Sequence, residues 1–130
     1  MKHINWIPLW IALATGPLVL IIQHGVRPGV PSTSPSWLLL GPLPNLIIGM
    51  CFPYIAVARP PGNPTSAARA FTLMTLATLG VQIVIEVTRL IPGADTFDLM
   101  DVAAALAGMF LGAVLYRRIA PHLRYDTRTE

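Results

Sequence analysis

The chain has 130 residues, of which 54% are hydrophobic and only 12% are charged, and its mean hydropathy is +0.62. A soluble domain of this size carries about twice that share of charged residues, so the composition excludes an ordinary soluble protein and indicates a polytopic membrane protein. The single cysteine, Cys51, excludes an intrachain disulfide and a thiolate metal cluster. No histidine spacing typical of a metal site is present, so we expect neither a metal nor another cofactor.

Four apolar stretches are long enough to cross a bilayer, which takes about 20 residues of helix. In chain order they cover residues 4–23, 37–58, 70–91 and 97–120. No small-residue cleavage site follows the first, so we interpret it as an uncleaved span and not as a signal peptide. The sequence therefore predicts an all-α polytopic membrane protein, a four-helix transmembrane bundle that forms one domain over residues 1–130.

The connections between the spans differ in length and composition. The first, over residues 24–36, and the second, over residues 58–69, are rich in Pro and Gly and favour loops. The third is a short Pro-Gly turn, which forces the last two helices into an antiparallel hairpin. Asp95 or Thr96 can cap the helix that follows. The tail after Pro121 is polar, and we expect it to be frayed.

Lys and Arg side chains are distributed unevenly between the two sides of this predicted bundle, and the richer side is normally cytoplasmic. Seven of the nine fall on the side of the two termini and the middle loop: Lys2, Arg59, Arg69, Arg117, Arg118, Arg124 and Arg128. Only Arg27 and Arg89 fall on the other side. We therefore expect both termini to be cytoplasmic and the last turn to be external. The net charge of +3 then reflects membrane topology, so we expect no nucleic-acid partner.

Charged side chains gather around the last turn, where five of the chain's fifteen lie: Glu86, Arg89, Asp95, Asp98 and Asp101. A charge at membrane depth is costly unless it is paired or hydrated, so this group is a candidate functional site. Helical spacing places Gln82 on the same stripe as Glu86 and Arg89. Asn45, in the second span, is a further polar residue that can line a pocket or form a hydrogen bond between helices.

Glu86 and Asp101 lie at nearly the same depth when they are counted from the turn, so they cannot both be bare anions. One interpretation is a structural pair of Arg89 with Glu86 or with Asp98, while Asp101 caps the last helix. Another is an external polar pocket for a ligand head group or a cation. A third is a proton relay or a catalytic acid pair. The sequence leaves these three interpretations open.

The last predicted helix also carries a packing motif. Gly108 and Gly112 form a GxxxG pair on the helix face that carries Asp101. Glycines at this spacing let a neighbouring helix backbone approach closely. We therefore expect this face to be packed inside the bundle.

The hairpin resembles the C-terminal signature of the VanZ-like family of small bacterial membrane proteins, which has a Glu in an apolar helix, a Pro-Gly turn, Phe-Asp-x-x-Asp and two glycines. The matching residues are Glu86, Pro92, Gly93, Phe97, Asp98, Asp101, Gly108 and Gly112. The chain departs from the family pattern at Arg89, where Gln is usual, at Ala94 in the turn, where Arg is usual, and at Ala105, where Asn is usual. The four-span layout is compatible with the same family.

The resemblance implies a protein of the bacterial plasma membrane, linked to teicoplanin resistance and cell-envelope physiology. We expect a non-enzymatic envelope role in which an external acidic pocket binds a lipid head group, a cell-wall precursor or a glycopeptide antibiotic. The alternatives are a membrane enzyme or proton-coupled carrier that uses Glu86 and Asp101, and a structural partner subunit held through Gly108 and Gly112. The expected partners are membrane lipids and a lipid-linked or amphiphilic ligand, and the sequence does not predict an oligomeric state.

Overall fold

The computed structural model describes residues 4–91 and 98–126 of the chain. Within these residues all regular structure is helical, which confirms the all-α prediction for the described part of the chain. The elements are α1 (Trp6–Leu20), η1 (Ile21–Val26), η2 (Arg27–Gly29), α2 (Pro35–Leu40), α3 (Leu43–Cys51), η3 (Phe52–Tyr54), α4 (Ile55–Ala58), α5 (Pro64–Thr88), α6 (Leu99–Ile119) and η4 (Ala120–His122).

Within the described residues, four helical runs are long and apolar enough to cross a membrane: Trp6–Gly29, Pro35–Ala58, Pro64–Thr88 and Leu99–His122. They overlap the four predicted spans, but the first continues to Gly29 and does not end at residue 23. The third begins at Pro64 and not at residue 70. The reason is a capping box, in which Asn63 Oδ1 accepts a hydrogen bond from Ser66 N (2.8 Å) and Ser66 Oγ accepts one from Asn63 N (3.1 Å). This reciprocal pair satisfies N–H groups that would otherwise be free in the first turn of α5.

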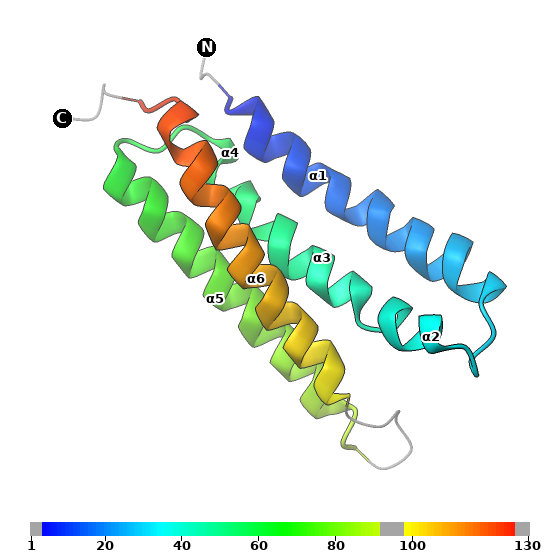
Figure 1. Ribbon diagram of the computed structural model, residues 1–130. Helices are drawn as coiled ribbons and strands as arrows, with labels where there is room; N and C mark the ends of the chain where they lie inside the picture. Colours follow the sequence, from blue (N-terminus) through cyan, green and yellow to red (C-terminus); the bar gives the residue numbers. More distant parts are fainter. Residues whose placement is uncertain (1–3, 92–97, 127–130) are drawn as a thin grey trace.

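The two ends of the described chain lie at the same end of the bundle (Figure 1). We call it the terminal end, and we call the opposite end, where α5 stops and α6 starts, the hairpin end. Asn5 joins the start of α1 to the end of α4 at the terminal end. Its backbone N–H donates to the carbonyl of Ala58 (2.8 Å), and its Nδ2 donates to the carbonyl of Val57 (3.1 Å).

The expectation of a frayed tail after Pro121 is wrong for residues 122–126. Asn5 Oδ1 accepts a hydrogen bond from Arg124 N (2.9 Å), and Asn5 Nδ2 donates to the Arg124 carbonyl (3.1 Å). Leu123 is buried in the side-chain core. The first residues of the tail are therefore fixed by one apolar contact and by the side chain of an asparagine from the other end of the chain.

The helices α3 and α6 pack backbone to backbone through three glycines. A Cβ atom on Gly112 would lie 2.6 Å from the carbonyl oxygen of Met50, and one on Gly108 would overlap the carbonyl of Leu46. Gly49 of α3 faces the backbone of α6 in the same way, since a Cβ there would lie 2.5 Å from a carbonyl oxygen. Gly108 and Gly112 therefore lie at a helix contact, as small residues do in membrane bundles. Their partner is α3, which is not the neighbour of α6 in the hairpin.

In the described part of the chain, buried side chains form a core cluster, made of Ala12, Tyr54, Val57, Ala67, Phe71 and Leu123. Tyr54 is completely buried, and its ring meets that of Phe71 edge to face at a centroid distance of 5.2 Å. Its hydroxyl donates a hydrogen bond to the carbonyl of Gly112 (2.8 Å). Tyr54 thus satisfies a backbone group beside the glycine contact while its ring fills the core.

Candidate functional site

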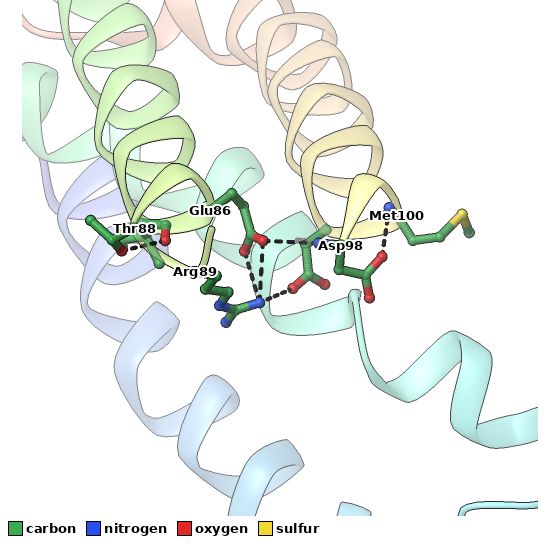
Figure 2. Close-up of polar contacts among 7 residues, drawn as sticks. Glu86, Thr88, Arg89, Asp98 and Met100 are labelled. Atoms are coloured by element: carbon green, nitrogen blue, oxygen red, sulfur yellow. Dashed lines mark hydrogen bonds and ion pairs between the residues drawn. The ribbon is translucent and has the colours of Figure 1, made fainter. Parts of the chain in front are cut away.

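Arg89 connects the end of α5 with the start of α6 at the hairpin end. Its Nη1 atom lies 3.0 Å from Oε1 and 3.2 Å from Oε2 of Glu86, and 3.2 Å from Oδ2 of Asp101. Figure 2 shows the guanidinium of Arg89 turned toward the carboxylate of Glu86. We call Glu86, Arg89 and Asp101 the Arg89 cluster. One guanidinium nitrogen therefore pairs with two carboxylates, that of Glu86 in α5 and that of Asp101 in α6.

Asp98 is not an ion-pair partner of Arg89; it caps α6. Its Oδ1 accepts a hydrogen bond from Met100 N (2.8 Å), and its backbone N–H donates to Oε2 of Glu86 (3.2 Å) (Figure 2). The interpretation in which Asp98 pairs with Arg89 while Asp101 caps the helix is therefore wrong. The extended backbone of Asp98 directs its carboxylate at the free N–H groups of the first turn, whereas Asp101 lies inside the helix. Asp95 and Thr96, the expected caps, lie outside the described residues.

Burial explains why the Arg89 cluster has to be paired. The side chains of Glu86 and Asp101 are only 4% and 11% exposed, whereas that of Arg89 is 34% exposed. A buried carboxylate without a partner is strongly destabilising. In the described part of the chain every buried side-chain nitrogen or oxygen has a hydrogen-bond partner. The most accessible member of the cluster is the guanidinium.

Gln82 lies one turn before Glu86 on α5 and is buried. Its Nε2 donates to the backbone carbonyl of Asn45 on α3 at 3.5 Å, which is the long limit of a hydrogen bond. This contact uses the main chain of Asn45 and not its side-chain amide. Gln82 therefore lies on the same face of α5 as Glu86, but its hydrogen bond connects α5 with α3. Arg89 instead connects α5 with α6.

Negative charge exceeds positive charge in this part of the hairpin end. The Arg89 cluster and Asp98 together bring three carboxylates against one guanidinium. Arg27, in the neighbouring connection, lies over the ring of Trp37 at 4.7 Å from its centroid, a cation–π contact. Within residues 4–91 and 98–126, no three His, Cys, Asp or Glu side chains lie close enough together to hold a metal ion. The carboxylate oxygens of this group can accept hydrogen bonds from a donor of opposite charge.

The terminal end has a cavity that the sequence analysis did not predict. It is about 220 Å³ in volume and opens between the start of α1 and the segment after α6. Asn5 lies in its wall, and an asparagine just before an apolar run normally indicates a helix cap. The Asn5 side chain makes no cap hydrogen bond, and it binds Arg124 across the cavity wall instead. The sequence thus marks Asn5 as a helix cap, whereas in the structure its side chain binds the segment after α6.

Comparisons of the chain with protein-family models, with curated proteins and with solved structures gave no match. The resemblance of the hairpin to the VanZ-like signature stays a prediction. Function is therefore inferred from the residues and their geometry.

Proposed function

We propose that the chain is a non-enzymatic protein of the bacterial plasma membrane, of the VanZ-like type, whose hairpin end binds the primary ammonium group of an amphiphile. Amine-bearing lipid head groups, cell-wall precursors and glycopeptide antibiotics share this group. In this proposal the hairpin end faces the outside of the cell and the ligand approaches from the outer leaflet.

One observation carries the proposal: two buried carboxylates share a single, partly exposed guanidinium. Arg89 balances one of the two charges, and the exposed Asp98 adds a third carboxylate nearby. An ammonium group has three donors and no acceptor, so it complements carboxylate oxygens. Its attraction to a carboxylate 4 Å away is about 4 kcal/mol near a protein surface before desolvation is counted.

The apolar surroundings of the cluster favour an amphiphile over a free cation. Leu90, Ile91 and Leu99 flank it and are 64%, 61% and 70% exposed. Exposed side chains of this kind at the end of a membrane span are placed to contact acyl chains or other apolar groups. A ligand with an amine next to an apolar body would use both features.

The proposal is tested by drug susceptibility of a strain that lacks the chain, complemented with the wild type or with variants. Glu86→Gln and Asp101→Asn keep the side-chain shape and remove one negative charge each, so we expect both to lose protection against glycopeptides. The control Asp126→Asn removes an acid at the terminal end and should protect as the wild type does. Membrane abundance of each variant is measured in parallel. Full protection by Glu86→Gln at equal abundance would rule out charge-based binding.

A structural role of the Arg89 cluster is the second candidate, and the complete pairing of its buried oxygens favours it. Hydrogen exchange of the hairpin in vesicles separates the two. Ligand binding predicts slower exchange in vesicles of phosphatidylethanolamine than in vesicles of phosphatidylcholine, whose head group has no N–H donor. A purely structural cluster predicts equal exchange in both.

Membrane topology gives a direct prediction. We expect a reporter fused after Glu130 to be cytoplasmic and one inserted between Ser32 and Ser36 to be external. The reasons are the excess of Lys and Arg near the termini and the position of both ends of the described chain at one end of the bundle (Figure 1). The measurement is the activity of an alkaline phosphatase fusion, which requires the periplasm. Phosphatase activity after Glu130 and none in the first connection would reverse the topology.

A further inference from the structure

We propose that the terminal end holds an anionic phospholipid, with its phosphate head group in the cavity between the start of α1 and the end of α6. This inference concerns the end of the bundle opposite to the Arg89 cluster and a ligand of opposite charge. It therefore does not depend on the proposed function.

The cavity has an apolar wall and a cationic rim. It is about 220 Å³ in volume, the space of about seven water molecules at ~30 Å³ each, which suits a head group and the start of an acyl chain. Ile4, Ile7 and Pro8 contribute the apolar wall on the side of α1, and Ile119 and Leu123 contribute it on the side of α6. Beside the buried Asn5, the polar side chains that line the cavity are His122 and Arg124, which form its rim.

The backbone of Arg124 is held in place although it lies beyond η4, the last helical segment. The backbone N–H of Arg124 donates to Asn5 Oδ1 (2.9 Å), and its carbonyl accepts from Asn5 Nδ2 (3.1 Å). Asn5 is only 5% exposed, so water competes little for these bonds. The backbone that carries the Arg124 side chain is thus ordered before a ligand arrives, which reduces the entropy lost on binding.

Charge at the terminal end complements a phosphate. In the described chain five arginines lie there, Arg59, Arg69, Arg117, Arg118 and Arg124, against one acid, Asp126. A basic residue near an anionic lipid head group contributes about 1 kcal/mol of attraction, and the contribution falls off with distance. Of the five arginines, only Arg124 lines the cavity.

The outer surface of α1 exposes apolar side chains, as we expect of a surface that contacts the acyl chains of the lipid. Trp6, Trp10 and Leu13 follow one another at helical spacing from the cavity along α1, and they are 57%, 64% and 53% exposed. Tryptophan is enriched at the level of lipid head groups. The apolar wall and this exposed stripe are the reasons to infer a phospholipid and not a free phosphate ion.

The test uses the full chain in vesicles of phosphatidylcholine and phosphatidylglycerol in equal amounts, with native mass spectrometry of the lipids that stay bound. We expect the wild type to retain phosphatidylglycerol about fivefold over phosphatidylcholine. Arg124→Gln removes the rim charge, and Ile4→Trp fills the cavity without changing any charge. Both should reduce the preference to about one.

The matched control is Arg69→Gln, which removes a charge from the same end but not from the cavity, and should keep the fivefold preference. If Arg69→Gln and Arg124→Gln reduce it equally, the attraction is diffuse and the site is overturned. Retention of the preference by Ile4→Trp, or no preference in the wild type, also overturns it. The thermal midpoint in pure phosphatidylcholine verifies folding. If Arg124→Gln does not fold, Ile4→Trp decides the outcome by itself.

Discussion

Gly108→Ala is expected to destabilise the folded protein by about 3 kcal/mol, a large effect for the addition of one methyl group. The new Cβ would overlap the carbonyl of Leu46 in α3. A backbone carbonyl cannot rotate aside as the end of a flexible side chain can, so α3 and α6 would have to move apart. That movement would also loosen the contact of Gly112 with Met50. The measurement is the free energy of unfolding in detergent micelles, followed by circular dichroism.

Gly80→Ala is the matched control for this prediction. Gly80 is a mid-helix glycine of α5, and a Cβ there would meet nothing within 4 Å. Because alanine favours helix over glycine, we expect this variant to be neutral or more stable by up to about 1 kcal/mol. Equal stability of Gly80→Ala and Gly108→Ala would show that α3 and α6 do not pack through their glycines.

The positions of the helices could be predicted from the sequence, but the pairing of α3 with α6 could not. Apolar runs of sufficient length mark the helices directly, and the GxxxG pair of Gly108 and Gly112 indicates a close contact. The partner is not marked in the same way, because Gly49 in α3 has no second glycine four residues away. Short connections predict which helices are neighbours, but not which pair packs most closely.

The roles of the acids in the hairpin also could not be assigned from spacing alone. Asp98 and Asp101 are both acids near a helix start, and which one caps depends on where the backbone becomes extended, which helix periodicity does not give. The order of the tail depends on Asn5 and Arg124, which are 119 residues apart in sequence. A hydrogen bond over that separation leaves no local pattern, so the polar composition of the tail alone predicts fraying.

Arg89→Ala is expected to have the largest effect of any single change at the hairpin end, a loss of about 3–5 kcal/mol. It would leave Glu86 and Asp101 buried, close together and without a cation. Glu86→Gln or Asp101→Asn should cost less, because each leaves one carboxylate paired with the guanidinium. Asp98→Asn should be mild, since asparagine caps helices nearly as well as aspartate. The measurement is the unfolding free energy of the four variants under the conditions used for Gly108→Ala.

Two further variants of the chain serve as controls for the Arg89→Ala prediction. Arg69→Ala removes an exposed arginine from the other end of α5 and should change stability by less than about 0.5 kcal/mol. The triple variant Arg89→Met, Glu86→Gln, Asp101→Asn removes all three charges of the Arg89 cluster. Because it leaves no unpaired buried charge, it should recover most of the stability that Arg89→Ala loses. If Arg89→Ala is instead the mildest of the four single variants, the two carboxylates do not depend on a shared cation.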